Sequence, residues 1–236
     1  MKQTKPILQV SNLRKVYKMG EERVVALNRV SLDIFPGEIC CIFGTSGSGK
    51  STFLNMLAGM EKPTAGSIKI LGREITTMSE QELAVFRQKH LGFIFQSYNL
   101  LPGSTAAENV ALPLMFKGVP RKQRDKVARE LLRRVGLENR ADHFPGQMSG
   151  GQQQRVGIAR AIVARPQVIF ADEPTGNLDT KTTEDVMRVI TSFSREFRQT
   201  IILVTHDPEM ARYATRIIHM VDGNIIEDSR GQELGA

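Results

Sequence analysis

Over its first forty residues the chain alternates short apolar and polar runs. The runs 7–17, 24–34 and 37–43 are rich in Val, Ile and Leu, and breaks fall at Gly20 and at Pro36–Gly37. Alternation of this kind, with turn residues between the runs, predicts strands. We therefore expect an N-terminal antiparallel β layer.

Helical patterns dominate the middle of the chain. Ser79-Glu80-Gln81-Glu82 matches a capping box, which predicts a helix to about Lys89, and an apolar strand is predicted at 91–96. Residues 100–148 read as mostly helical, and one helix there is expected between Pro120 and Gly136. The apolar stripe of that helix is predicted to consist of Val127, Leu131, Leu132 and Val135.

Strands and helices alternate again in the last third. We expect a helix at 150–164, a strand at 168–172, a helix at about 181–198, a strand at 200–206 and a final apolar stretch at 216–226. Apolar strands between helices predict a mainly parallel sheet covered on both faces. The predicted fold is α/β: a core with a mainly parallel sheet, an N-terminal antiparallel β layer and a helical insertion subdomain at about 97–148. We expect residues 1–236 to form a single domain.

Composition adds limits to this outline. A chain of 236 residues with 41% hydrophobic and 24% charged residues can build a sizeable core. No stretch approaches the roughly 18 uncharged apolar residues of a membrane span, and the first ten residues lack the apolar run of a signal peptide. We therefore expect a cytoplasmic protein, at most peripheral on the inner face of the cell membrane. The adjacent Cys40 and Cys41 are interpreted as small buried hydrophobes.

Positive charge is concentrated in the middle of the chain. The net charge is +7, with +9 in residues 87–165 against +3 in 1–86 and −5 in 166–236. Such an excess is typical of a surface for nucleic acid, an anionic membrane or an acidic partner, and equally of a solvated helix face.

The motif with the clearest chemistry lies directly after the apolar run that ends at residue 43. Residues 44–52 read GTSGSGKST and match the phosphate-binding pattern G-x-x-x-x-G-K-[ST] between a predicted strand and a predicted helix. Glycines let a backbone wrap around phosphate oxygens, and a helix N-terminus attracts negative charge. Lys50 can reach the outer phosphates and Ser51 can ligate Mg²⁺. The motif makes the predicted α/β core a P-loop NTPase core. The expected nucleotide-binding residues are Gly44, Thr45, Ser46, Gly47, Ser48, Gly49, Lys50, Ser51 and Thr52.

Acidic and polar residues follow three other predicted strands. Asp172 and Glu173 end VIFADE, His206 closes TIILVTH, and Gln96 closes LGFIFQ. Strand ends of this kind meet at the crevice where α/β sheets bind ligands. Asp172 is then suited to hold Mg²⁺, and Glu173 to polarise an attacking water. His206 can donate a hydrogen bond to a γ-phosphate, and the Gln96 amide can ligate Mg²⁺ or orient water.

A second glycine-rich helix start occurs at MSGGQQQR. Ser149 is suited to cap the helix, while Gly150 and Gly151 permit close backbone approach next to Gln152. One nucleotide already has the loop 44–52 for its phosphates. A second anion-binding helix start therefore suggests that two chains share each nucleotide.

These motifs together resemble the ATPase subunits of ABC transporters along essentially the whole chain. In the family's order they are GTSGSGKST, Gln96, SGGQ at 149–152, VIFADE, NLD at 177–179 and His206. The resemblance implies ATP and Mg²⁺ as ligands, and a head-to-tail ATP-sandwich dimer with a second copy. Ser149, Gly151 and Gln152 of one copy would complete the site at the phosphate loop of the other.

The resemblance also assigns further site residues and a subclass. Tyr17 matches the aromatic residue that stacks on adenine, and Asp179 belongs to the D-loop. The segments FQSYNLLPGSTAAENVALPL and ADEPTGNLD look like ATPases of the macrolide-exporter and lipoprotein-releasing type, including the related cell-division pair. The partner implied is an integral membrane permease, with the helical insertion and the Gln96 region facing it.

Three functions are compatible with an ATPase of this kind. The favoured one is an ATPase that drives export or the extraction of lipid-anchored substrates through a separate permease. The alternative is a non-transport ATPase that levers a permease-like partner for transmembrane signalling. A soluble ATPase of DNA repair or translation is disfavoured, because only 105 positions separate Gly44 from Ser149 and the chain holds one cassette. No nucleic acid partner is expected.

Overall fold

The computed structural model describes residues 5–230, which divide into two compact units, 5–87 with 200–230, and 88–199. The first four residues of the N-terminal stretch lie outside the described residues. Within the described residues no helix is long and apolar enough to cross a membrane.

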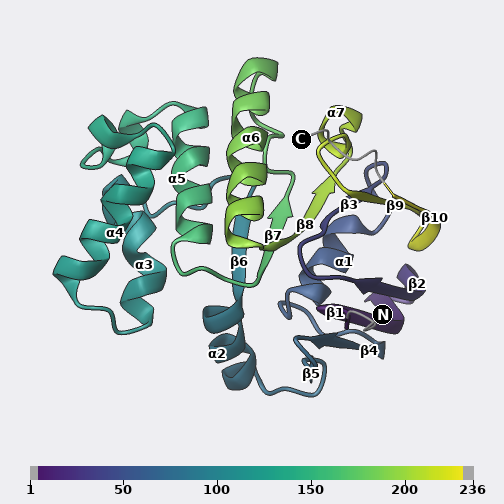
Figure 1. The fold of residues 1–236 in the computed structure, drawn as a ribbon. Helices are drawn as coiled ribbons and strands as arrows, with labels where there is room; N and C mark the ends of the chain where they lie inside the picture. The colour runs from purple at the N-terminus through teal and green to yellow at the C-terminus, as the bar shows by residue number, and fades with distance from the viewer. Residues whose placement is uncertain (1–4, 231–236) are drawn as a thin grey trace. The chain divides into compact units, whose positions relative to one another are not determined.

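The first unit contains an antiparallel sheet with the strand order β2-β1-β4-β5 (Figure 1). Its strands are β1 (Leu8–Met19), β2 (Glu22–Ile34), β4 (Ala65–Ile70) and β5 (Arg73–Glu74). Burial alternates along β2, where Val30, Leu32 and Ile34 are buried and Ser31 and Asp33 are exposed. The period of two gives the sheet one apolar face, as the sequence pattern predicts.

A parallel group of strands follows in the same unit. β3 (Ile39–Phe43) pairs in parallel with β8 (Thr200–Thr205) on one side and with β9 (Arg216–Val221) on the other. β10 (Asn224–Arg230) pairs antiparallel with β9, across a turn in which Asp222 and Gly223 both have positive φ. Positive φ at both central positions is what a tight type I′ hairpin requires. The core of this group is β3, whose residues 39–42 are buried.

Two of the three helices that the structure describes in the first unit begin where local signals predict them. They are α1 (Lys50–Leu57), α2 (Glu80–His90), which contains the boundary between the units, and the short α7 (Pro208–Ala211). Ser79 and Glu82 form the expected reciprocal cap, since Glu82 Oε2 accepts from Ser79 N at 2.8 Å and Ser79 Oγ accepts from Glu82 N at 3.3 Å. The α7 helix has no counterpart among the sequence predictions.

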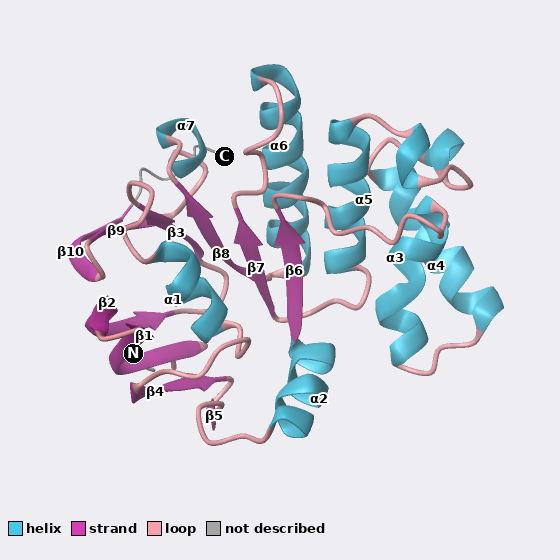
Figure 2. Cartoon of the chain, turned by 180° about the vertical axis from the view of Figure 1, so that it is seen from behind, coloured by secondary structure: helices cyan, strands magenta, loops and turns pink. Residues whose placement is uncertain are grey.

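The second unit combines a short parallel strand pair with a group of helices. The pair is β6 (Leu91–Phe95) with β7 (Val168–Asp172). The helices are α3 (Ala106–Phe116), α4 (Arg121–Arg134), α5 (Gly150–Ile162) and α6 (Thr180–Phe197), with 3₁₀ turns η1 (Glu138–Arg140) and η2 (Pro145–Gln147). Helices α3, α4 and α5 lie side by side in both Figure 1 and Figure 2.

The apolar stripe of α4 differs from the predicted one by one residue. Val127 is 40% exposed, so its assignment to the stripe is wrong, and Ala128 is fully buried in its place. Residues 128, 131, 132 and 135 follow the i, i+3, i+4, i+7 spacing of one helix face.

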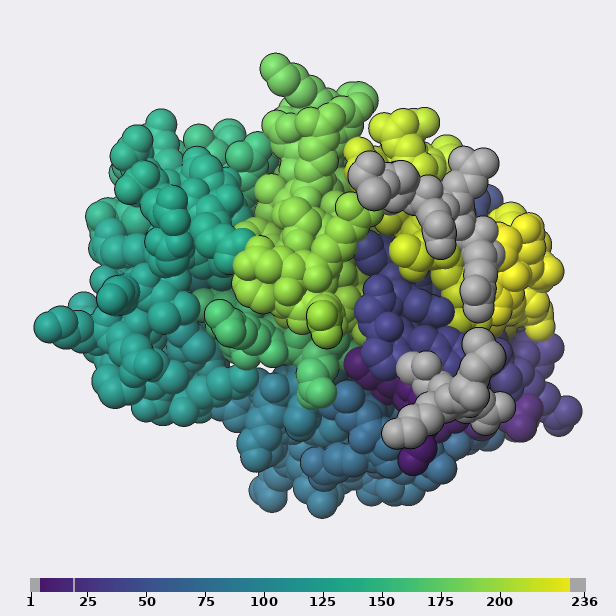
Figure 3. Space-filling view, viewed as in Figure 1, coloured from purple at the N-terminus to yellow at the C-terminus, as the bar shows by residue number. Residues whose placement is uncertain are grey.

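Part of the positive charge on α4 is neutralised locally. The side chains of α3 and α4 form the teal surface at the left of Figure 3. Arg129 forms ion pairs with Asp125 and Asp142, and Arg133 pairs with Glu130. Exposed ion pairs of this kind contribute little to the stability of the fold. They do reduce the net positive charge on the surface of α4.

Candidate nucleotide-binding and catalytic site

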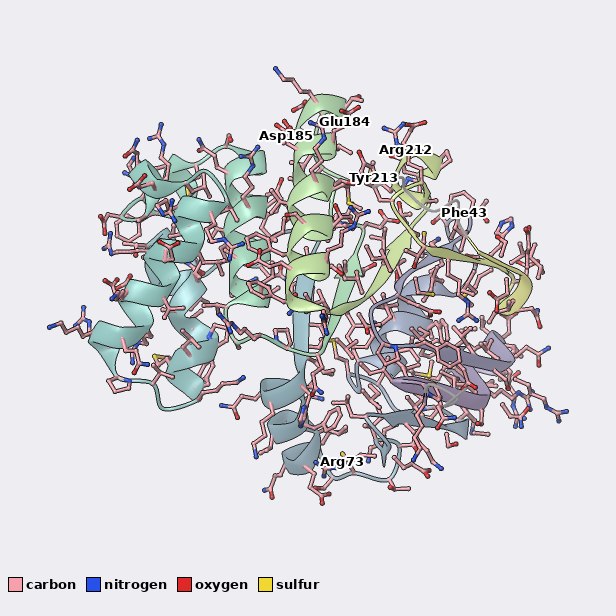
Figure 4. All side chains as sticks on the ribbon, viewed as in Figure 1. Phe43, Arg73, Glu184, Asp185, Arg212 and Tyr213 are labelled. Carbon is pink, nitrogen blue, oxygen red and sulfur yellow. The ribbon has the colours of Figure 1, made fainter. Side chains whose placement is uncertain are left out.

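The phosphate loop joins β3 to α1 in the first unit. β3 ends at Phe43, which Figure 4 labels, and α1 begins at Lys50. Gly47 and Gly49 have φ values of 81° and 97°, which L side chains rarely adopt. Gly49 is the N-cap of α1 and makes no side-chain cap, so no capping side chain occupies the amides of the first turn. Those amides are the donors that a phosphate group would accept from.

Packing inside the loop fits a bound polyphosphate. Ser48 is 2% exposed, and its Oγ has no hydrogen-bond partner among the described residues. A Cβ at Gly44 would lie 2.3 Å from the Met220 carbonyl oxygen and 2.8 Å from Ser48 Oγ. The buried Lys50 donates from Nζ to the Thr45 carbonyl at 2.7 Å. The loop therefore combines a buried hydroxyl with a buried cation, and close packing against the Met220 carbonyl favours glycine at position 44.

Strand register brings His206 to the same place. Phe43 of β3 is paired with Thr205 of β8 in a parallel ladder. The next residues, Gly44 and His206, therefore leave adjacent strands at the same edge of the sheet. His206 is exposed there, as expected for a side chain that contacts a ligand. The structure thus brings two predicted site residues together within one unit.

Tyr17 lies in β1 and is tied to two charged side chains. Its hydroxyl donates to Glu61 Oε2 at 2.8 Å, and Lys15 forms an ion pair with Glu61 at 2.7 Å. The Lys15 ammonium lies 5.0 Å from the centroid of the Tyr17 ring. Burial raises the pKa of Tyr17, so its hydroxyl stays protonated at neutral pH. The ring orientation is therefore fixed before any ligand binds.

The second unit brings Gln96, Asp172 and Glu173 to one strand edge. Phe95 of β6 is paired with Asp172 of β7, so Gln96 and Glu173 leave adjacent parallel strands. A Cβ at Gly176 would lie 2.7 Å from Gln96 Nε2 and 3.4 Å from Glu173 Oε2. The two predicted catalytic side chains therefore flank the same glycine.

Backbone strain accompanies this convergence. Glu173 has a φ of 42°, a left-handed conformation that is uncommon outside glycine. Asn177 donates from Nδ2 to the Gln96 carbonyl at 3.2 Å, which fixes the turn 173–177 against the end of β6. Strained backbone held by its surroundings is a frequent feature of functional sites.

The glycine-rich start of α5 has the predicted cap. Ser149 Oγ accepts from Gln152 N at 3.3 Å, and Gln152 Oε1 accepts from Ser149 N at 3.0 Å. A Cβ at Gly151 would lie 2.4 Å from Thr182 Cγ2 of α6. Glycine is therefore required here by the close approach of two helix starts.

Asp179 caps the start of α6, which packs against the start of α5. Its carboxylate accepts from Thr182 N at 3.0 Å and from Thr182 Oγ1 at 2.7 Å. These hydrogen bonds lower the pKa of Asp179, so it is ionised at neutral pH. Asp179 is a predicted site residue by resemblance, whereas no local sequence signal pointed to its partner Thr182.

Magnesium would need oxygen ligands beyond the protein. Among the described residues no group of three His, Cys, Asp or Glu side chains is arranged to hold a metal ion. Mg²⁺ in nucleotide sites is held by one or two protein oxygens together with phosphates and water. The predicted ligands Ser51, Gln96 and Asp172 each carry an oxygen of that chemical kind.

Four residues with a structural part in the site were missed by sequence reasoning. They are Tyr98, Gln154, Arg160 and Gly176. Gly176 within the run PTGN carries a local signal, since a glycine next to the acidic strand end is typical of close packing. The other three residues make contacts with residues about 20 to 60 positions away in the sequence, so no local sequence pattern marks them.

Fold and motifs together define a nucleotide-binding ATPase cassette. Residues 27–176 match the family model described as ABC transporter, and the chain belongs to this family. The macrolide export ATP-binding/permease protein MacB of Salmonella choleraesuis strain SC-B67 is 48% identical over 227 residues, 96% of this chain and 35% of that protein. MacB of Escherichia coli strain K12 is 47% identical over 223 residues, 94% of this chain and 34% of that protein.

Solved structures agree with this assignment. A dimeric structure of the ATP-binding cassette MJ0796 in a post-hydrolysis state bound to ADP and Pi has a TM-score of 0.87 and 43% identity, covering 94% of this chain and 98% of that one. The dimeric structure of MJ0796, described as a bacterial ABC transporter cassette, has a TM-score of 0.88 and 44% identity over the same shares. The chain spans about a third of the length of the MacB proteins.

Proposed function

We propose that this chain binds and hydrolyses ATP and thereby powers a separate membrane permease in export or in the extraction of lipoprotein or lipid. The observation that carries the proposal is the phosphate loop, with its buried Ser48 hydroxyl, its buried Lys50 and the positive φ values of Gly47 and Gly49. The phosphates bind to the loop 44–52, and the adenine stacks on Tyr17. Residues 97–148 serve as a helical subdomain within the cassette.

Each catalytic side chain has one role in this proposal. Glu173 accepts the proton of the attacking water, and Gln96 orients that water from the other side of Gly176. His206 donates to the γ-phosphate and stabilises the charge that develops on it. Mg²⁺, held by Ser51 and Asp172, would neutralise charge on the phosphate oxygens.

A second copy of the chain completes each site. Ser149, Gly150, Gly151 and Gln152 at the start of α5 offer a capped helix N-terminus to the nucleotide of the partner, and Asp179 lies beside them. MJ0796 is described as a dimer in both solved structures, which supports this arrangement. Binding of two ATP then closes the head-to-tail dimer, and hydrolysis opens it.

A groove in the second unit offers a place for the permease. Its volume is about 640 Å³, and Leu101 and Met115 on its lining are 47% and 41% exposed. The lining also carries charged side chains, among them Arg121, Arg124 and Asp125, so the groove offers both apolar and charged contacts to an amphipathic helix of a partner protein. The MacB relatives are named ATP-binding/permease proteins, so a permease segment is the expected occupant. The chain would then be peripheral on the cytoplasmic face of the cell membrane.

Steady-state hydrolysis tests the enzymatic part. The wild-type chain should release phosphate from ATP in the presence of Mg²⁺, whereas Lys50→Ala should lose most of its affinity for a fluorescent ATP analogue. Unchanged affinity in Lys50→Ala would refute the role of the phosphate loop. For the transport part, Leu101→Arg should abolish co-purification with a permease and keep basal hydrolysis; retention of the permease would exclude the groove.

A further inference from the structure

Two consecutive residues after Gln96 adopt left-handed backbone conformations. Tyr98 has a φ of 60° and Asn99 a φ of 48°. A left-handed φ is unfavourable for a residue with a bulky side chain. Other parts of the second unit must therefore hold this segment in place.

Arg160, in the last turn of α5, supplies that hold. Its Nη2 donates to the Tyr98 carbonyl at 2.7 Å, and its Nη1 donates to the Asn99 carbonyl at 2.6 Å. Burial lowers the pKa of Arg160, which shows that the guanidinium has given up much of its hydration to reach these carbonyls. A planar guanidinium can bridge two carbonyls at once, whereas an ammonium concentrates its charge at one point.

The side chain of Tyr98 leads back to the start of the same helix. A Cβ at Gly157 would lie 3.7 Å from the Tyr98 carbonyl, and a Cβ at Gly150 would lie 2.7 Å from the Tyr98 hydroxyl oxygen. Gly150 and Gly157 are two helical turns apart on one face. Tyr98 therefore packs along a glycine-lined face of α5 and ends against the glycine that follows the Ser149 cap.

A third tie joins α5 to the acidic strand end. Gln154, fully buried in α5, donates from Nε2 to the carbonyl of Pro174, the residue after Glu173. The segment that contains Gln96 and the turn that contains Glu173 are thus both attached to the helix that begins at Ser149.

We propose that Arg160 and Tyr98 are positioning residues that make the segment 96–99 and the start of α5 move as one element. A rearrangement at Gln96 on nucleotide binding then shifts the start of α5, through which this copy contacts the nucleotide of its partner. This inference rests on the proposed function. Within one chain, it assigns the coupling between the segment 96–99 and the start of α5 to the Arg160 guanidinium and the Tyr98 side chain.

The test compares Arg160→Lys and Tyr98→Phe in a Glu173→Gln background, where ATP is bound and not hydrolysed. Arg124→Lys is the matched control, because the Arg124 guanidinium also donates to a backbone carbonyl of the same unit, that of Val119, at 3.2 Å. Light scattering measures the ATP concentration for half-maximal dimerisation, and a fluorescent ATP analogue measures binding to the monomer.

We expect Arg160→Lys to require about tenfold more ATP for dimerisation and Tyr98→Phe about threefold more, with binding to the monomer within twofold of the parent. The double variant should show less than the product of the two effects, because both residues act in one unit. A merely structural role would lower the unfolding temperature and weaken both measurements together.

Each remaining outcome is decisive. If both variants dimerise at the ATP concentration of the parent, or shift no more than Arg124→Lys, the positioning role is overturned while the proposed function stands. If the Glu173→Gln parent does not dimerise with ATP, the proposed function fails, and the inference that rests on it fails too.

Discussion

Gly176 offers a sharp test of how the two catalytic side chains are placed. A Cβ there would lie 2.7 Å from Gln96 Nε2, so the amide would have to retreat by about 0.7 Å to reach the 3.4 Å of an ordinary contact. Gly176 has no positive φ, so alanine is compatible with the backbone. Gly176→Ala therefore displaces Gln96 and touches Glu173 while leaving the rest of the unit intact.

The size of the effect follows from that displacement. A misplacement of about 1 Å near a reacting group can cost roughly a hundredfold in rate. A shift of somewhat less than that should lower kcat about tenfold, equivalent to about 1.4 kcal/mol in the activation free energy. The affinity for ATP should stay within twofold, because the phosphate loop belongs to the other unit of the chain.

Phosphate release under saturating MgATP gives kcat, and the binding of a fluorescent ATP analogue gives the affinity for nucleotide. Gly103→Ala is the control, since a Cβ at Gly103 meets nothing within 4 Å and the residue lies in the same unit. Wild-type kcat in Gly176→Ala, or a loss confined to ATP affinity, would refute the placement of Gln96 and Glu173 around this glycine.

Three further predictions follow from buried groups. Gly44→Ala should destabilise the fold by about 1 to 3 kcal/mol in chemical denaturation, because its Cβ would lie 2.3 Å from the rigid carbonyl oxygen of Met220; a neutral result would contradict the packing of the loop. Asn109→Ala should cost about 2 to 3 kcal/mol, since the fully buried Asn109 makes four hydrogen bonds to backbone groups; loss of less than about 1 kcal/mol would contradict this. Burial raises the pKa of Cys41 to about 12 and also raises that of Cys40, so neither thiol should react with a thiol reagent at pH 8 until the chain unfolds; rapid labelling of the folded chain would show that they are accessible.

The raised thiol pKa values also set a pH dependence. The unfolded chain releases these protons near the ordinary thiol pKa of about 8.5, whereas the folded chain retains them. The unfolded state therefore binds fewer protons above that pH, and the stability of the fold should fall as the pH rises through about 9. Serine at both positions should remove this part of the alkaline destabilisation.

Local patterns were enough to predict the starts of α2 and α5 and the ends of the buried strands. The caps at Ser79 and Ser149 were found because each depends on residues three positions apart, and both are confirmed. The fold class is confirmed as well, since a strand–loop–helix at 39–57 and parallel pairing of β3 follow from the apolar runs. The site assignments remain predictions, although the structure brings Gln96 and Glu173 to one strand edge.

What the sequence does not predict depends on partners far away in the chain. One of the four predicted positions of the α4 stripe was wrong, because Val127 and Ala128 are both apolar and only packing decides which of them is buried. The bonds from Arg160 to Tyr98 and Asn99 span about 60 positions, and nothing local marks either end. The adjacency of Gly44 and His206 requires the pairing of β3 with β8, which periodicity alone does not specify.

The most direct test of the account is the mass and nucleotide content of Glu173→Gln with ATP and Mg²⁺. Light scattering during size-exclusion chromatography, with nucleotide analysis of the eluted peak, gives both values. The account predicts a dimer that contains two ATP and turns over at less than a hundredth of the wild-type rate. A monomer that hydrolyses ATP at the wild-type rate would contradict it.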